Sequence, residues 1–455
     1  MGDTTDSFVD WIEVNKIFPL DVASNYNFGK SVSLDNNYIV IGSPWHNYSA
    51  SYSGVVYVYK YFGSNYIHQA TLSALDAEEW DNFGFSVSIS NDFIVVGAPW
   101  SKQNEISTGA VYVFTRNGND WVQQAKLVAF DAEEEDFFGS SVEIFGDYIV
   151  IGAPWHNSNG VYSGAAYVYK RDGSDWTFQT KLVSSDAQAY DLFGSSVSIN
   201  GDYIVVGARG SQGCAYIFKV QESNWFEQVK LIDEQGQSGD NFGCSVSIDN
   251  QFVVIGAKGT NNKRGSAYVY KQSESIWEKQ TQLSISEGVY GDNFGFSVDI
   301  SGEYILIGAP GSHSDRGSAY MYRWYDSTWE LQDILVGSDI LADDMFGSSV
   351  SIDNDIVVIG APFHMIDEIQ TGSCYVFQRK DTIQRVIIFG RIKNLTDYED
   401  FITFQAVATN VVTFFPFSLS RYRSEEVFTI TKYYNYVYFG LFTMRYLLAW
   451  CKIIQ

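Results

Sequence analysis

Hydrophobic and polar residues follow the same order at seven places along the 455-residue chain. In one of them, Ser86–Ile89 alternates polar and apolar side chains, Asn91-Asp92 interrupts the pattern, and Phe93–Gly97 is almost continuously apolar. Alternation predicts a strand with one buried face, whereas a short apolar run predicts a strand covered on both faces. Because Asn, Asp and Gly tolerate the backbone of a tight hairpin, the two strands are predicted to pair.

Two more predicted strands complete each unit. A loop of variable length leads to a third strand, such as Gly109–Phe114, which has Tyr at its centre. The fourth strand follows the pattern Trp-x-x-Gln-x-Lys-Leu, as in Trp121–Leu127, and Tyr66 replaces the Trp once. Four short strands with their turns account for the distance between successive units.

The seven units predict one closed ring. Each begins with Phe-Gly, at residues 28–29, 83–84, 138–139, 193–194, 242–243, 294–295 and 346–347. Seven four-stranded sheets arranged radially make a seven-bladed β-propeller, an all-β fold. Residues 11–18 match a fourth strand that has no first three before it, and the last unit has no fourth strand of its own. The N-terminal strand is therefore predicted to complete the last blade, in a propeller domain that spans residues 8–380.

Phe-Gly followed by Gly-Ala-Pro resembles the FG-GAP repeat, the unit of the integrin α-chain propeller and of many bacterial and protist proteins. The resemblance covers roughly residues 11–380, and it implies an integrin-like propeller that acts in binding or cell adhesion at the cell surface or in secreted form. Integrin α-chains also carry DxDxDGxxD calcium loops between first and second strands. The corresponding turns here, such as Asp35-Asn36 and Ser301-Gly302, are too short to wrap an ion. No metal site is therefore carried over.

The charge balance narrows the classes of partner. The formal net charge is −25, and the segment 381–455 holds eight basic and six acidic residues, so residues 1–380 carry −27. Such an acidic body repels nucleic acid and favours cations or basic partners. An Asp two residues before Phe-Gly recurs in six units, and we interpret it as a turn residue that bonds its own backbone, with a weak cation site as the alternative. These residues are Asp81, Asp136, Asp191, Asp240, Asp292 and Asp344.

The sequence offers no catalytic signature. The five His residues show no HExxH or other metal-ligand spacing, and no G-x-S-x-G elbow or phosphate-binding loop occurs. The four Cys residues have no paired spacing. We predict no enzyme, no cofactor and no catalytic residue. An enzyme with an accessory propeller would need a catalytic domain, which the segment 381–455 does not supply.

The loops between second and third strands carry the candidate binding residues. Four blades that adjoin in a closed ring place aromatic residues there, whereas the other three have Arg209-Gly210, Lys258-Gly259 and Gly311. Exposed aromatic residues are typical of protein-binding surfaces, and their faces also stack on sugars. The alternative is that each Trp packs down on its own loop. The candidates are Trp45, His46, Trp100, Trp155, His156, Phe363 and His364.

Two functions follow as hypotheses. The first is a non-enzymatic scaffold, similar to the integrin α-chain propeller, that binds a protein partner on this face. The second is a lectin-like propeller that stacks glycans on the same Trp residues.

Residues 381–455 break the repeat. Segments 401–420 and 433–451 are long and apolar enough to be candidate membrane segments, although polar residues interrupt the first and Arg445 the second. A small packed domain and a misread gene end are the alternatives. The N-terminus lacks the basic and apolar regions of a signal peptide. The cell compartment therefore stays open.

Overall fold

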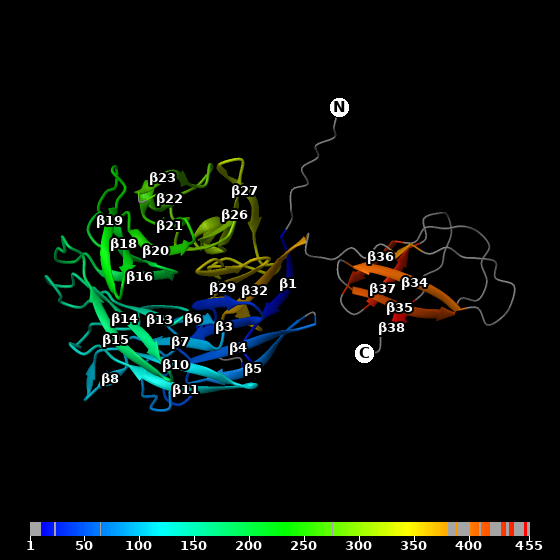
Figure 1. Ribbon diagram of the computed structural model, residues 1–455, viewed down its shortest axis with the longest axis horizontal. Helices are drawn as coiled ribbons and strands as arrows, with labels where there is room; N and C mark the ends of the chain where they lie inside the picture. The colour runs from blue at the N-terminus through cyan, green and yellow to red at the C-terminus, as the bar shows by residue number, and fades with distance from the viewer. Residues whose placement is uncertain are drawn as a thin grey trace. The chain divides into compact units, whose positions relative to one another are not determined.

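The computed structural model describes residues 11–21, 24–63, 65–274 and 276–380, together with the backbone of short strands between 388 and 452. The chain divides into two compact units, Met1–Gln378 and Arg379–Gln455. The first unit is a ring of seven four-stranded antiparallel sheets (Figure 1). The predicted all-β, seven-bladed propeller is confirmed.

Three blades are formed by residues 31–182, and the strands of each are given from the innermost outward. Blade 1 is β2 (Ser31–Asp35), β3 (Tyr38–Ser43), β4 (Val55–Phe62) and β5 (Asn65–Leu72). Blade 2 is β6 (Ser86–Ser90), β7 (Phe93–Ala98), β10 (Ala110–Asn117) and β11 (Asp120–Leu127), with a small hairpin of β8 (Lys102–Gln103) and β9 (Ile106–Ser107). Blade 3 is β12 (Ser141–Phe145), β13 (Tyr148–Ala153), β14 (Ala165–Asp172) and β15 (Asp175–Leu182).

The next three blades follow the same order. Blade 4 is β16 (Phe193–Asn200), β17 (Tyr203–Ala208), β18 (Cys214–Gln221) and β19 (Asn224–Leu231). Blade 5 is β20 (Phe242–Asp249), β21 (Phe252–Ala257), β22 (Ser266–Ser273) and β23 (Ile276–Leu283), with the short turn α1 (Thr260–Lys263). Blade 6 is β24 (Ser297–Ser301), β25 (Tyr304–Ala309), β26 (Ser318–Tyr325) and β27 (Thr328–Leu335), with the turn α2 (Ser312–Asp315).

Blade 7 joins the two ends of the ring. It consists of β28 (Ser349–Asp353), β29 (Ile356–Ala361), β32 (Ser373–Arg379) and, on the outside, β1 (Trp11–Ile17). Its loop carries a hairpin of β30 (Met365–Ile366) and β31 (Ile369–Gln370). The predicted closure of the ring by the N-terminal strand is confirmed.

Strand β1 reproduces the contacts of the other fourth strands. Trp11 packs edge-to-face on Tyr304 of blade 6, with ring centroids 5.6 Å apart. The Lys16 Nζ lies 2.5 Å from an Asp339 oxygen, as the fourth-strand Lys126 of blade 2 lies 2.6 Å from Asp76. Blade 7, which closes the ring, therefore has the same kinds of aromatic and charged contact as the other blades.

The packing and backbone conformation of each Phe-Gly pair explain why the pair recurs in every blade. Phe83 is fully buried in a cluster that includes Val58 of blade 1 and Val96 of blade 2, so it packs between blades. Burying such a side chain contributes about 1.5–3 kcal/mol relative to leaving it exposed. Gly84, the glycine of the same pair, has a φ of +90°, which side chains resist.

The glycine that ends each second strand meets the next blade. A Cβ on Gly97 would lie 2.1 Å from the carbonyl oxygen of Gly139, the Phe-Gly glycine of blade 3. The two glycines of the repeat therefore pack against one another across every blade boundary, where no side chain fits.

The second unit contains two three-stranded sheets, which we describe by themselves. One comprises β33 (Ile388–Phe389), β34 (Phe401–Ala408) and β35 (Val411–Ser418), and the other β36 (Thr429–Tyr433), β37 (Tyr436–Gly440) and β38 (Trp450–Lys452). The remaining residues of the candidate membrane segments 401–420 and 433–451 lie outside the described residues. In the part of the chain that is described, no helix combines the length and apolar character of a membrane span.

Candidate functional site

One face of the ring carries both the loops after the second strands and the connections between blades. The two run together, since the Trp80 N–H donates to the Ser51 carbonyl and the Tyr190 N–H to that of Val161. We call this the loop face. Its loops after the second strands are residues 44–54, 99–109, 154–164, 209–213, 258–265, 310–317 and 362–372. The aromatic half comprises the loops of blades 7, 1, 2 and 3, and the basic half those of blades 4, 5 and 6.

The three candidate histidines lie below the surface of the aromatic half. His46, His156 and His364 are only 2–4% exposed. The Nδ1 of His156 lies 2.8 Å from Asp136, and its Nε2 lies 2.6 Å from the Nζ of Lys181. Because Lys is donor only, this network assigns the ring proton to Nδ1, which donates to Asp136.

The same network recurs in blade 7, where His364 contacts Asp344 at 2.7 Å and Lys16 at 2.9 Å. In blade 1 only part of it remains, since the Nε2 of His46 lies 2.8 Å from Asp21 and its Nδ1 has no hydrogen-bond partner within the described residues. Burial lowers the pKa of His46, although Asp21 opposes the shift. These histidines hold each loop to the connection that precedes its blade, so they can position a binding surface without facing the solvent.

The candidate Trp residues lie higher in the same loops. Trp45 is 40% exposed, whereas Trp100, Trp155 and Phe363 are half-buried. Trp100 and Trp155 belong to a line of six rings with successive centroids 5.0–5.8 Å apart, close enough for favourable edge and tilted contacts. We call this line the aromatic row. It runs through Phe85, Trp100, Phe137, Trp155, Tyr162 and Tyr190.

A second aromatic contact joins the loop of blade 1 to the next connection. Tyr52 and Trp80 stack with centroids 4.3 Å apart and an interplanar angle of 15°. Trp80 is 53% exposed, and Tyr190, at the equivalent position after blade 3, is 59% exposed. This pair was not predicted from the sequence, because its members are distant in the chain and one is in a connection rather than a loop.

The backbone at these exposed aromatics is strained. Trp80 and Tyr190 have φ values of +73° and +67°, and Glu135 and Asp343 share the positive φ at this position, where Gly239 and Gly291 stand before blades 5 and 6. A bulky residue in the left-handed region is uncommon, and such strain concentrates at functional sites. Aligning the repeats reveals the signal, since an aromatic residue replaces glycine immediately before the recurrent Asp.

That recurrent Asp is a turn residue. In each of six connections its Oδ2 accepts a hydrogen bond from the backbone N–H three residues earlier, at 2.6–2.8 Å. The predicted turn role is confirmed. Burial raises the pKa of one of them, Asp81, to about 6. Within the described residues, no group of three or more His, Cys, Asp or Glu is placed to hold a metal ion.

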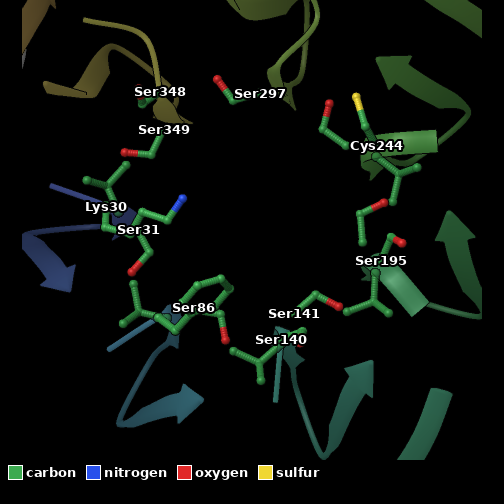
Figure 2. A pocket seen from close by; sticks show the side chains of 18 of the residues that line it. Lys30, Ser31, Ser86, Ser140, Ser141, Ser195, Cys244, Ser297, Ser348 and Ser349 are labelled. Carbon is green, nitrogen blue, oxygen red and sulfur yellow. The ribbon is translucent and has the colours of Figure 1, made fainter. Parts of the chain in front are cut away.

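The centre of the ring is a channel with a cavity of about 270 Å³ (Figure 2). A serine in each innermost strand donates its hydroxyl to the Phe-Gly carbonyl of the next blade, at 2.7–3.0 Å. The seven bonds form a closed ring between neighbouring blades. The donors are Ser31, Ser86, Ser141, Ser196, Ser245, Ser297 and Ser349.

A second ring of hydrogen bonds lies two residues further along these strands. There a side-chain oxygen accepts the N–H of an Ile or Leu in the next blade, as Ser33 accepts from Ile89 at 3.1 Å. Blades 3 and 6 use carboxyl groups instead of serine. Burial raises the pKa of Glu143 to about 8 and that of Asp299 to about 6, and the Asp299 charge adds to the shift of Glu143.

The repeat matches the FG-GAP repeat family over most of the chain, at residues 11–59, 66–114, 121–169, 176–218, 225–270, 277–322 and 329–377. The protein belongs to the FG-GAP repeat family. Each matched segment of this FG-GAP propeller begins with the outer strand of one blade and continues through three strands of the next.

Solved structures resemble this chain at low sequence identity, and the first of the two below shares its fold. A chain in the crystal structure of the Mitotic Checkpoint Complex is 11% identical, has a TM-score of 0.52, and is matched over 83% of this chain and 95% of that one. The crystal structure of Saccharomyces cerevisiae Sqt1 is 11% identical with a TM-score of 0.43, over 81% of this chain and 99% of that one. No curated protein matches the sequence.

Proposed function

We propose that this FG-GAP propeller is a non-enzymatic scaffold that binds a protein partner on the aromatic half of its loop face. The observation that carries the proposal is the set of rings gathered there, in the aromatic row and in the Tyr52–Trp80 stack. Most of these rings are half-buried, and Trp80 and Tyr190 are exposed. Trp and Tyr dominate the binding energy of protein interfaces, because they bury a large area and lose little conformational entropy.

The rigidity of the ring supports this role. Closed rings of hydrogen bonds fix the blades, and the buried His156 and His364 fix the loops that carry the aromatic residues. A surface that is already ordered loses less entropy when a partner binds. The acidic charge of the propeller would also steer a basic partner toward it.

The same contacts argue against catalysis by these histidines. Both ring nitrogens of His156 contact protein groups, namely Asp136 and Lys181, and the ring is buried. A general base must reach the proton that it abstracts from a substrate. His156, and His364 with the equivalent contacts to Asp344 and Lys16, are therefore assigned to structure.

A variant with Trp45→Ala, Trp100→Ala and Trp155→Ala tests the proposal. Partners would be purified with the tagged full-length protein from its own cells and quantified by mass spectrometry. We expect the specific partner to be lost, with affinity falling by at least about 30-fold, since each hot-spot residue contributes about 2 kcal/mol. A Phe226→Ala, Ile276→Ala variant, which removes exposed apolar residues from outer strands, should retain the partner. Retention by the triple Trp variant, with an unchanged melting temperature, would contradict the proposal.

Glycan binding is the second candidate. The flat Tyr52–Trp80 stack, with Trp80 half exposed, has the form of a platform on which the apolar face of a sugar stacks. A glycan that binds there should change the Trp fluorescence of the wild type but not that of a Trp80→Ala variant by the same amount. Unchanged fluorescence across a broad glycan panel would exclude this candidate.

A further inference from the structure

Lys30 lies at the mouth of the central channel at the loop face, and two basic residues from distant parts of the sequence, Arg209 and Lys258, lie within electrostatic reach of it. Lys30 follows Phe-Gly in blade 1, and its amino group points into the channel in Figure 2. Arg209 and Lys258 follow the second strands of blades 4 and 5, where the other five blades have Pro. Burial lowers the pKa of Lys30, and the positive charges of Lys258 and Arg209 lower it further. Lys30 therefore lies within electrostatic reach of both residues.

Within the part of the chain that the structure describes, these cations have no carboxylate partner. Over residues 24–63, 65–274 and 276–380, none of the three forms an ion pair. By contrast, three fourth-strand lysines, Lys126, Lys181 and Lys230, each contact an Asp at 2.6–2.8 Å. A chain with 54 acidic residues therefore leaves this basic cluster uncompensated.

Aromatic rings hold the two lysines instead. The Lys30 Nζ lies 5.4 Å from the ring centroid of Phe85, and the Lys258 Nζ lies 4.3 Å from that of Phe296. Cation–π contacts stabilise the charge but leave the ammonium donors free to bond another group. Partly buried cations that repel one another are unfavourable without an anion, so an anion bound between them would be strongly stabilised.

Hydroxyl groups surround the same level of the channel. Ser140, Ser195 and Ser348 occupy the position of Lys30 in blades 3, 4 and 7 and line the cavity. Each hydroxyl now donates to a backbone carbonyl three residues earlier, at 2.6–2.8 Å, and can rotate to donate to a bound oxygen.

We propose that the channel mouth at Lys30, with the charges of Arg209 and Lys258 near it, binds a phosphate group, either as inorganic phosphate or as a small phosphate monoester. The planar guanidinium of Arg209 suits bidentate contact with phosphate, and the two lysines match its second charge. The cavity of about 270 Å³ lies just below the roughly 300–1,000 Å³ of typical small-molecule pockets. Its size selects a small ligand. This site does not depend on whether a protein binds the aromatic half.

Isothermal titration calorimetry with the full-length protein at low ionic strength tests the proposal. Sodium phosphate and glycerol 3-phosphate are the two probes, and sodium acetate is the monovalent control. We expect phosphate to bind with one site per chain and acetate to bind at least about tenfold more weakly. Binding of glycerol 3-phosphate would show that the mouth admits an ester, and its absence alongside phosphate binding would assign the site to the free ion. Absence of binding for both probes would overturn the proposal.

The phosphate affinities of single variants test where the ion binds. Lys30→Met and Lys258→Met should each weaken phosphate binding by about tenfold or more, because each removes a charged donor. Lys102→Met, in the peripheral hairpin β8, makes the same charge change and should leave the affinity unchanged (Figure 1). Lys30→Ser introduces the residue that blades 3, 4 and 7 have at this position, and it serves as a second variant in case Lys30→Met misfolds. Wild-type affinity in the Lys30 variants would overturn the assignment.

Discussion

The two halves of the loop face share one scaffold and differ in what their loops carry. In the aromatic half the loops after the second strands are the longer ones, at 44–54, 99–109, 154–164 and 362–372, with Trp or Phe after the Pro. In the basic half the loops 209–213, 258–265 and 310–317 are shorter, and Gly follows Arg209, Lys258 or Pro310. Because the serine ring runs unbroken through both halves, the loops can vary without changing the fold. The hydrogen-bonded centre of the ring, which we call the hub, determines the stability of the fold, and the loops carry the residues that can bind a partner or ligand.

The largest effect should come from the contact that both halves share. Gly97→Ala, in the aromatic half, and Gly256→Ala, in the basic half, place a Cβ 2.0–2.1 Å from the glycine carbonyl of the next blade. Since backbone must move to relieve either clash, we expect each to lower the free energy of unfolding by about 3 kcal/mol, the upper end of the usual cost of overpacking. Urea denaturation measures both. A large loss for one variant and none for the other would show that the hub is not uniform.

Removing the side chain that anchors a loop should cost more stability in the aromatic half than in the basic half. His156→Ala removes the contacts to Asp136 and Lys181, and should lower the unfolding free energy by about 2–3 kcal/mol, because both partners are charged groups. Thr260, at the same position in blade 5, bonds only the Ala257 carbonyl and Ser266 hydroxyl. Thr260→Ala should therefore lower it by about 1 kcal/mol. Equal losses in thermal denaturation would contradict the anchoring role of the histidine.

The two channel carboxyl groups give a pH test. The raised pKa of Glu143, about 8 against an ordinary 4.5, means that the folded chain holds a proton that the unfolded chain has lost. Stability therefore falls as the pH rises from about 4.5 to about 8. Glu143→Gln should remove this fall, by about 2 kcal/mol at pH 9, with water in the channel reducing the full effect.

Asp299 should respond less to the same test. Three donors, the Ser247 hydroxyl and the Ile300 and Ile352 N–H groups, favour its charged form and limit its pKa to about 6. Asp299→Asn should flatten the stability profile between about pH 4 and 6, and should also reduce the fall at higher pH, because the Asp299 charge no longer raises the pKa of Glu143. Unfolding measured from pH 4 to 9 compares the two, and a larger shift for Asp299→Asn would contradict the assignment.

The smallest effect on stability should come from the exposed ring of Trp45. Because this side chain is 40% exposed and lies in a loop, Trp45→Ala should lower the unfolding free energy by less than about 1 kcal/mol. Trp121→Ala, by contrast, removes a buried ring that packs on Tyr38 of the neighbouring blade, and should lower it by about 3–5 kcal/mol. Similar losses would show that Trp45 is structural.

Much of the fold was predictable because the same pattern of strand and turn residues occurs seven times. The strands, the hairpin turns and the ring closure at Trp11 each follow from periodicity and from residue types that special backbones require. Burial of His156 was not predictable, since a histidine after Trp suits both an exposed site and a buried network. The same holds for Lys30 and Lys258, which belong to blades 1 and 5 and come within electrostatic reach only when the ring closes.

The central claim is that a partner contacts the aromatic half. Site-specific photo-crosslinking tests it directly, with p-benzoylphenylalanine in place of Trp45 or Trp155 and, as the matched probe in the basic half, in place of Asn261. Irradiated in its own cells, the protein should form the same crosslinked species from positions 45 and 155 and none from 261. Crosslinking from 261 alone, or with equal yield from all three positions, would contradict the account.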